Sequence, residues 1–415
     1  MLGLPANYWR LWGASAVSNL ADGIFFIVLP LLAVRLTDSP ILVAGVAIAG
    51  RLPWLFFVLI AGALADRLDR RRTMRNVQLL RVGVMGTLVV LALVDGLSLP
   101  ILYVAALVLG IGETLFDTAA QSILPAVVEK DKLALANGRL YGAELVMNQF
   151  VGPPLGGLLI AISVPLALGS SVVGYALAAM GLTLVVGSFK ARREGPPTRL
   201  TTDIAEGLRY LLRHRVLRTL ALMVGVMNLA GAATGAILVL YAVSPGPMNL
   251  SEPEFGLFAT TFAVGSVAGS IAAARMERRV GRIPLLFLCV TVSAVSFAVP
   301  AFTANVFLIA PAFVVSGVFV VVWNVITVSL RQRIIPDHLL GRVNSAYRLF
   351  AWGSQPVGAL LGGLIGEALG LPAVFLLGGI TTLLLLFTRT VLTEEAIVAA
   401  EAEAPAGPAP AAGTA

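Results

Sequence analysis

The chain has 415 residues, of which 58% are hydrophobic and only 12% are charged. Soluble domains carry about 25% charged residues, so most of this chain does not face water. The net charge of +7 does not indicate nucleic-acid binding, which needs a basic face on a folded soluble module. One Cys and two His exclude a disulfide framework and a metal site built from those residues.

Apolar runs of about 20 residues, long enough to cross a bilayer, recur from the start of the chain to its last tenth. We predict an all-α integral membrane protein with twelve transmembrane helices, which places both termini on the same side. In chain order the predicted spans are 9–34, 40–64, 76–95, 99–124, 137–162, 166–188, 217–243, 255–274, 284–302, 305–331, 346–369 and 372–392.

The basic residues gather in the loops of one side. Short loops rich in Arg and Lys stay in the cytoplasm. The loops around 67–75, 130–139, 190–199, 275–282 and 331–342 are all basic, whereas the opposite loops hold only Arg35. We therefore expect a multi-pass protein of the inner (plasma) membrane with both termini cytoplasmic.

The longest loop divides the chain. We predict an N-terminal six-helix half at 1–188, a cytoplasmic linker at 189–216, a C-terminal six-helix half at 217–392 and a disordered cytoplasmic tail at 393–415. In the linker, Ile204, Leu208 and Leu211 recur at helical spacing, which predicts an amphipathic helix on the inner membrane surface. The single cysteine, Cys289, is expected to be a small buried hydrophobe.

The two halves repeat each other. Asn19-Leu20-Ala21 returns as Asn228-Leu229-Ala230, and a second set of matches keeps one spacing: Tyr141, Gln149, Gly152, Gly156 and Gly157 correspond to Tyr347, Gln355, Gly358, Gly362 and Gly363. Because six spans is an even number, the halves are parallel repeats. In such a protein the substrate site lies between the halves near the midplane, and transport is a rocking of one half against the other.

Three motifs carry a family resemblance. The segment from Gly62 to Arg72 closely resembles the signature loop of the major facilitator superfamily, with Asp69 where that pattern has Gly. The run Gly152-Pro153-Pro154-Leu155-Gly156-Gly157 is similar to the Gly-Pro motif of the superfamily's antiporters. The segments 123–125 with 136–137, and 340–343, resemble the macrolide-efflux and multidrug branch of drug–proton antiporters, although the Arg-containing motif of the fourth span is missing. The resemblance implies the major facilitator fold.

Two of these motifs have expected physical roles. The gating motif comprises Gly62, Asp66, Arg67, Arg70 and Arg71. Asp66 is expected to meet a helix N-terminus of the other half, and Arg70 and Arg71 to pair with acids such as Glu129; the alternative is a loop that only sets topology. The packing motif comprises Gly152, Pro153, Gly156 and Gly157, which permit close helix contact and a kink.

Ionisable residues inside spans are costly and are therefore functional hypotheses. Asp22 shares a face with Asn19 and is a proton-coupling candidate, with a structural ion pair to Arg51 as the alternative. Glu113, Asp117 and Gln121 form one stripe on the fourth span, which lines the cavity in this fold; pairing with the signature-loop arginines is the alternative.

A second polar face lies on the fifth span. Tyr141, Glu144 and Asn148 share it, and Glu144 is either a proton-coupling residue or a structural or gating partner. Arg81 is expected to extend from the inner end of the third span toward lipid headgroups.

The corresponding elements of the C-terminal half hold no acids. That half offers polar and aromatic side chains instead: Asn228, Trp323, Asn324, Tyr347, Trp352 and Gln355. We expect proton handling in the N-terminal half and substrate contacts in the C-terminal half, with drift between repeats as the alternative. Asn19, Arg51, Gln121 and Asn148 are further candidates for the substrate cavity.

The resemblance and these residues together predict a proton-coupled secondary exporter of small amphipathic organic molecules, such as drugs, macrolides or secondary metabolites. No phosphate-binding loop for ATP occurs in the sequence, so we expect no cofactor besides the proton gradient. Expected partners are the substrate and membrane lipid, with no nucleic acid, around a monomer. A lysophospholipid flippase or a siderophore exporter is the alternative, and a membrane-embedded enzyme, for which the His, Cys and carboxylate clusters are missing, is a remote one.

Overall fold

The structure is a computed structural model that describes residues 4–57, 68–129, 132–187, 189 and 200–403. Within these residues every named element is a helix, and an isolated bridge joins Val243 to Leu250. The all-helical expectation is confirmed. Gly62, Asp66 and Arg67 of the signature loop lie outside the described residues.

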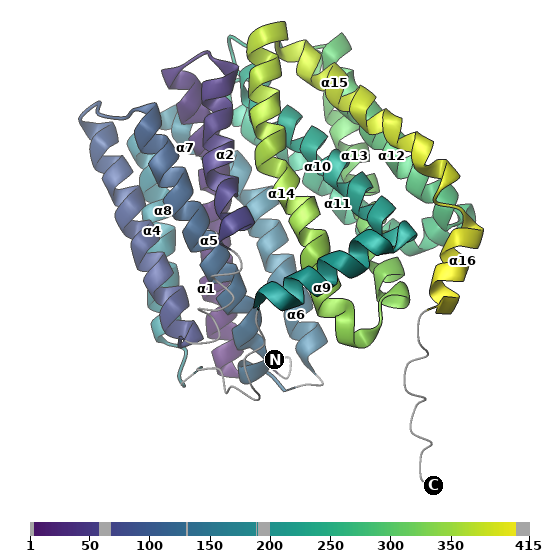
Figure 1. The fold of residues 1–415 in the computed structure, drawn as a ribbon. Coiled ribbons are helices and arrows are strands. Elements are labelled where there is room, and N and C mark those ends of the chain that lie inside the picture. The colour runs from purple at the N-terminus through teal and green to yellow at the C-terminus, as the bar shows by residue number, and fades with distance from the viewer. Residues whose placement is uncertain (1–3, 58–67, 130–131, 188, 190–199, 404–415) are drawn as a thin grey trace. The chain divides into compact units, whose positions relative to one another are not determined.

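Each of the twelve predicted spans overlaps helical structure (Figure 1), although the span 137–162 is divided among α6, a π-helical segment and α7, and residues 58–64 of the second span lie outside the described residues. The N-terminal helices are α1 (Ala6–Leu36), α2 (Pro40–Phe56), α4 (Arg70–Leu93), α5 (Leu99–Val127), α6 (Leu133–Leu145), α7 (Gly152–Ile162) and α8 (Val164–Thr183). The C-terminal ones are α10 (Arg215–Ala242), α11 (Glu252–Val280), α12 (Arg282–Phe302), α13 (Val306–Ile334), α14 (Asp337–Leu369) and α15 (Leu371–Leu383), with α9 (Leu200–Arg213) before them and α16 (Glu394–Glu403) after. Among the described residues, ten helices are long and apolar enough to cross a membrane.

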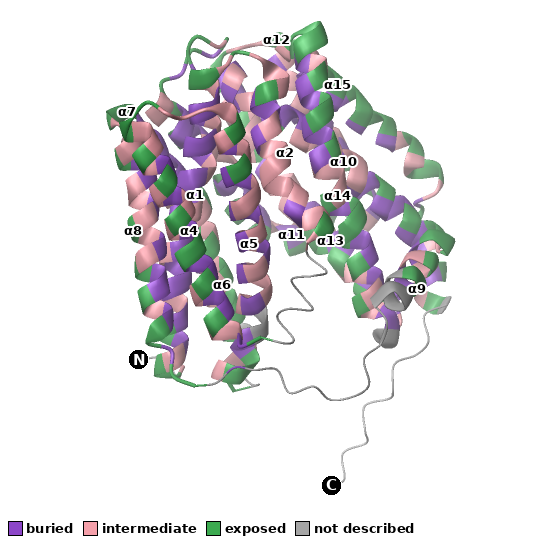
Figure 2. Ribbon diagram, turned by 60° about the vertical axis from the view of Figure 1, so that its left-hand side comes forward, coloured by how far each residue is buried: buried purple, intermediate pink, exposed green. Residues whose placement is uncertain are grey.

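The exposed faces of the helices are apolar. Large hydrophobic side chains are exposed along α4 and α8, among them Leu79, Val90, Leu93, Val173 and Leu177. Figure 2 shows such exposed residues spread over the outer surfaces of both helices. Contiguous exposed apolar surface of this kind is unusual for a soluble protein and is typical of helices that contact lipid.

The residues divide into two compact units. Unit 1 contains Met1–Glu194, Gly235–Ala263 and Ala359–Leu371, so it combines α1 to α8 with parts of α10, α11 and α14. Unit 2 contains Gly195–Thr234, Val264–Gly358 and Pro372–Ala415. The contacts below lie within one unit or the other.

Glycines in unit 1 bring α1 and α7 together backbone to backbone. A Cβ atom at Gly152 would lie 2.6 Å from the carbonyl carbon of Gly23, and one at Gly156 would lie 2.9 Å from the carbonyl oxygen of Ile24. A π-helical segment, Val146–Val151, leads into α7 directly before Pro153. Pro153 has no backbone N–H and cannot donate the hydrogen bond that would continue the preceding helical turn. The change from α-helical to π-helical hydrogen bonding before it is therefore explained by the sequence.

The start of α11 also packs into unit 1. Arg35 at the end of α1 binds Glu252 through both carboxylate oxygens, at 2.6 and 2.8 Å, and donates to the carbonyl oxygen of Ile160 at 3.1 Å. Ser39 donates to Glu367 of α14 at 2.7 Å. The only basic residue of the loops predicted to face outward therefore joins α1 and α7 to α11.

Asp69, the residue that departs from the signature pattern, begins α4. Its carboxylate accepts hydrogen bonds from the backbone N–H groups of Arg72 and Phe189, both at 2.9 Å. Burial raises the pKa of Asp69, but these two hydrogen bonds and the guanidinium groups of Arg71 and Arg72 outweigh it and leave that pKa below its ordinary value. The acid thus caps a helix that Gly could not cap with a side chain.

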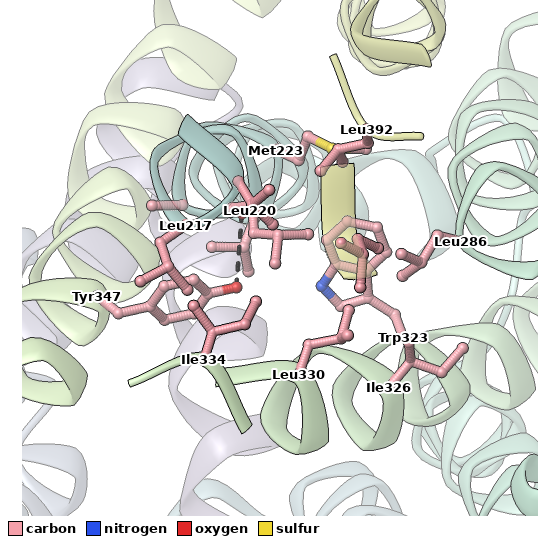
Figure 3. Packing of buried hydrophobic residues seen from close by; sticks show 14 of the residues in the cluster. Leu217, Leu220, Met223, Leu286, Trp323, Ile326, Leu330, Ile334, Tyr347 and Leu392 are labelled. Carbon is pink, nitrogen blue, oxygen red and sulfur yellow. Dashed lines mark hydrogen bonds between the residues drawn. The ribbon is translucent and has the colours of Figure 1, made fainter. Parts of the chain in front are cut away.

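Unit 2 has one large apolar core. Leu217, Leu220 and Met223 of α10 pack there against residues of α12, α13 and α14, as Figure 3 shows. Cys289 is fully buried in this core, which confirms the expectation for the single cysteine. On α9, Leu211 is also fully buried in it, and Glu206 forms an ion pair with Arg342.

The expectation of disorder from residue 393 onward is wrong for Glu394–Glu403, which form α16. Ile397 is fully buried and Ala400 is 5% exposed in the core of unit 2. Glu401 forms ion pairs with Arg282, at 2.7 Å, and with Arg333, at 3.5 Å. Apolar burial and these pairs order a segment whose Ala- and Glu-rich composition suggested a free tail. Residues 404–415 lie outside the described residues.

The close approach of α1 and α7 predicts a specific sensitivity. We expect Gly152→Ala to lower the free energy of unfolding by about 1–3 kcal/mol, because the new methyl group overlaps backbone atoms of Gly23. Gly86→Ala on α4 is the matched control, since no heavy atom lies within 4 Å of its methyl group. Thermal unfolding of both variants in one detergent measures the difference, and equal stability of the two would contradict the contact.

Candidate functional site

Asp22 of α1 is held by two other helices of unit 1. The Tyr175 hydroxyl of α8 donates to its Oδ1 at 2.7 Å. Nη1 of Arg81, from α4, lies 3.1 Å from Oδ1 and 3.3 Å from Oδ2. The side chain of Arg81 is 2% exposed and that of Asp22 is 14% exposed, so this is a buried ion pair. A buried pair of this kind is strongly destabilising to break, because the surviving charge is left without compensation.

Two sequence-based expectations are corrected here. The predicted partner of Asp22 was Arg51, but the guanidinium carbon of Arg51 instead lies 5.7 Å from the ring centroid of Phe26. Arg81 was expected to extend to lipid headgroups, but it points into the bundle and pairs with Asp22. A charged side chain at this depth gains more from a carboxylate than from an interface it would have to reach along its own helix.

Polar side chains surround the pair. Arg81 stacks on Phe116 and Tyr175, with distances of 5.6 and 5.2 Å from its guanidinium carbon to the ring centroids. Gln78 donates to the Ser18 hydroxyl at 2.6 Å, and both residues are fully buried. Sequence reasoning missed Gln78, Ser18 and Tyr175. The signal for Gln78 was its place three residues before Arg81, on the same helical face.

Two acids on α5 lie beside this pair. Glu113 and Asp117 are one helical turn apart and partly buried. Among the described residues neither makes a hydrogen bond or an ion pair. Glu113 interacts electrostatically with Asp22, Arg51, Arg81 and Glu144, and Asp117 interacts with Glu113, Glu144, Arg81 and Asp22. We call Asp22, Arg51, Arg81, Glu113, Asp117 and Glu144 the charge cluster. The structure thus brings all four predicted proton-coupling acids into one group.

The other N-terminal candidates are spread more widely. Asn19 donates to the carbonyl oxygen of Ser15 of its own helix at 2.9 Å, Tyr141 is exposed, and Asn148 is partly buried with its backbone against Gly23. Glu144 belongs to the charge cluster, but its side chain is exposed. The side chain of Gln121 lies outside the described residues.

The expected pairing of the signature loop with Glu129 is wrong for Arg71. Arg71 donates to the carbonyl oxygen of Val185, and Glu129 pairs with Lys132 at 2.6 Å. Lys132 lies only three residues from Glu129 in the same short connection, so Glu129 pairs with Lys132 rather than with Arg71 on a separate helix.

Two C-terminal candidates are core residues of unit 2. Trp323 is 2% exposed and Tyr347 is 4% exposed, among Leu220, Leu330 and Ile334 (Figure 3). The expectation that they line a cavity is corrected, because their faces are covered by these leucine and isoleucine side chains.

The remaining C-terminal candidates, Asn228, Asn324 and Gln355, have no described contact with the charge cluster. Asn228 of α10 donates to the carbonyl oxygen of Ala351 of α14 at 2.7 Å. Asn324 is exposed and donates to Val320 of its own helix at 3.0 Å, and Gln355 is partly buried.

Known proteins resemble this chain over nearly its whole length. The sequence model of the family described as transmembrane secretion effector matches residues 6–410. The multidrug efflux pump Tap of Mycolicibacterium fortuitum is 30% identical over 392 residues, which cover 90% of this chain and 92% of that protein. Macrolide efflux protein A of Streptococcus pyogenes is 20% identical over 377 residues, with 90% and 92% covered.

A solved structure shares the fold. The crystal structure of a bacterial homologue of the iron transporter ferroportin, in an inward-facing state, matches with a TM-score of 0.71 at 18% identity. The match covers 93% of this chain and 99% of that one. At this identity the likeness shows the fold alone. Among the described residues, no group of three or more His, Cys, Asp or Glu side chains could hold a metal ion.

A bundle of long apolar helices with charged groups buried inside it defines a multi-pass membrane protein of the major facilitator fold. The chain belongs to the transmembrane secretion effector family, within the drug-efflux-like transporters of the major facilitator superfamily. The resemblance found in the signature loop and the Gly-Pro motif is thereby confirmed.

The buried pair predicts a double-mutant result. We expect Asp22→Asn to lower the free energy of unfolding by about 3–5 kcal/mol, because Arg81 is left as an uncompensated buried charge. The double variant Asp22→Asn/Arg81→Met removes both charges and should recover much of that loss. Unfolding in detergent micelles measures both. A double variant less stable than Asp22→Asn alone would show that the pair is not the source of the loss.

Proposed function

We propose that the chain is a proton-coupled exporter that moves small amphipathic organic molecules across the membrane by alternating access. The observation that carries this proposal is the charge cluster of unit 1. Ionisable groups within an apolar bundle are expensive, and they mark ion and proton pathways. The relatives named as multidrug and macrolide efflux proteins support export as the direction.

The members of the cluster have different roles in this proposal. Asp22 has two direct partners, Arg81 and Tyr175, so its negative charge is held in place. Glu113 and Asp117 have none among the described residues, and they lie one turn apart, where two negative charges repel each other. A proton on either removes that repulsion. We therefore assign the transported proton to Glu113 and Asp117, and a fixed counter-charge to Asp22.

The charge balance indicates the class of substrate. The cluster holds four carboxylates, of Asp22, Glu113, Asp117 and Glu144, and two guanidinium groups, of Arg51 and Arg81. With Asp22 paired to Arg81, the remaining acids outnumber the single remaining Arg51. Such a site attracts neutral or cationic amphipaths more than anions. A cationic substrate and the proton then compete for the same carboxylates, so binding of the proton favours release of the substrate.

The placement in the membrane follows from the basic loops. Arg-rich connections on one side, against Arg35 alone on the other, favour an inner-membrane protein with cytoplasmic termini. Both repeats are present in one chain, so a monomer supplies the two halves that alternating access needs. The sequence has no phosphate-binding loop, and the proton gradient is the energy source in this proposal.

Export from proteoliposomes tests the proposal. Vesicles are loaded with a fluorescent amphipathic cation, and efflux is recorded with and without an inward proton gradient. We expect gradient-driven efflux in the wild type and its loss in Glu113→Gln, because the amide cannot take up the transported proton. Binding of the dye should be retained, since the other acids of the cluster are unchanged.

A matched control separates coupling from general charge effects. Glu129→Gln removes one acid whose side chain is 69% exposed and which lies outside the charge cluster, so gradient-driven efflux should be unchanged. Substrate exchange without a gradient should persist in Glu113→Gln. Normal coupling in both Glu113→Gln and Asp117→Asn would refute the assignment. Absence of efflux in the wild type, with flipping of lysophospholipid instead, would refute the substrate class.

A further inference from the structure

Arg331 lies in the last turn of α13 and is only 9% exposed. Its guanidinium carbon lies 3.7 Å from the ring centroid of Tyr347 on α14, so the two side chains are stacked. The negative face of an aromatic ring and the carbonyl end of a helix both attract a cation. These contacts offset only part of the cost of burying a full charge, for which a carboxylate partner is the usual solution.

No such partner is present in the described part of the chain. None of its carboxylates forms an ion pair with Arg331, and the buried Nε–H of that residue has no hydrogen-bond partner. Arg348 of α14, another cation, also interacts electrostatically with it. The site therefore has two positive charges, an unused buried donor and no anion.

Other arginines of the described residues do have carboxylate partners. Arg81 of unit 1, which is buried to a similar degree, is paired with Asp22. Arg282 and Arg333 share Glu401, and Arg342 is paired with Glu206. Arg333 is only two residues from Arg331, yet it finds a carboxylate. Within the described residues, acids thus pair with the arginines near Arg331 in the sequence but not with Arg331 itself.

The surroundings indicate which anion would complete the site. Arg348 is exposed, and it is followed directly by Leu349 and Phe350, which are 43% and 38% exposed. An exposed cationic side chain next to exposed apolar side chains suits a molecule with a charged head and a hydrocarbon chain. The site lies at the end of α13 that the basic loops predict to be cytoplasmic, and an end of a membrane-spanning helix is where lipid headgroups are expected. Guanidinium groups match the geometry of phosphate oxygens, and basic pockets between membrane helices on this side bind lipid headgroups.

We propose that Arg331 and Arg348, between α13 and α14, bind the phosphate group of an anionic membrane phospholipid. The phosphate oxygens accept from the unused Nε–H of Arg331 and neutralise the two guanidinium groups. The acyl chains lie along Leu349 and Phe350. This site lies in unit 2 and does not depend on the charge cluster of unit 1 or on proton coupling.

Lipid titration of the full-length protein tests the proposal. The protein is purified in detergent, stripped of lipid and titrated with phosphatidylglycerol, and bound lipid is counted by native mass spectrometry. We expect Arg331→Gln to weaken the tightest binding step at least about ten-fold, because hydrogen bonds to charged groups are lost. Arg333→Gln is the matched control: it removes the same charge two residues away, from a side chain that is 49% exposed and paired with Glu401. It should bind lipid like the wild type.

Further measurements distinguish the other outcomes. Arg348→Gln, a change at an exposed residue, should also weaken binding, and it keeps the test valid if Arg331→Gln does not fold. Phosphatidylcholine, which carries no net charge, should bind no tighter to the wild type than to Arg331→Gln. Equal losses in Arg331→Gln and Arg333→Gln would overturn the site in favour of a general basic rim. Displacement of phosphatidylglycerol by millimolar inorganic phosphate would show that soluble phosphate, not lipid, is the ligand.

Discussion

The ion pair between Asp22 and Arg81 is the contact on which the N-terminal helices depend. An apolar bundle has no water to solvate an isolated charge, so each buried ionisable group must find its partner within the fold. Here the carboxylate of α1 is met by the guanidinium of α4 and the hydroxyl of α8, and Arg81 is enclosed by the rings of Phe116 and Tyr175. Because Phe116 of α5 lies against Arg81, this point also helps to position Glu113 and Asp117, which form no ion pair within the described residues. The arrangement of the site therefore follows from the pairing of the buried charges of Asp22 and Arg81.

The helices themselves could be predicted from the sequence because length and apolar composition decide whether a segment crosses a membrane. The shared face of Glu113 and Asp117 was also accessible, since residues three and four apart share a helical face. That Asp22 and Glu144, on two other helices, lie close enough to interact with them was not. The partner of Asp22 was not. Spacing within a helix determines which face a residue occupies but not which neighbouring helix covers that face, and Arg51 and Arg81 were both compatible with it.

Other errors have equally physical causes. Trp323 and Tyr347 have the same spacing whether they face a cavity or the core, and only the packing of unit 2 shows that they are buried. The helix α16 was missed because Ala and Glu dominate its composition. The residues that hold it, Ile397 and Glu401, gain their stabilising contacts from segments far away in the sequence. Asp69 looked like a defect in a motif, and its role as a cap became visible only with the backbone of Phe189 beside it.

The position of α16 has a consequence for biosynthesis. Its side chains belong to the same apolar core as those of α10, α12 and α13, yet the ribosome makes it later than every other member of that core. Helices α1 to α8 can assemble around Asp22 and Arg81 while the rest of the chain is still being translated, because domains fold in the order of synthesis. The C-terminal helices, by contrast, enter the membrane with part of their core still missing. They must wait for Ile397 to emerge before the core of unit 2 can close, and until then part of its apolar surface is uncovered, the condition in which nascent chains aggregate.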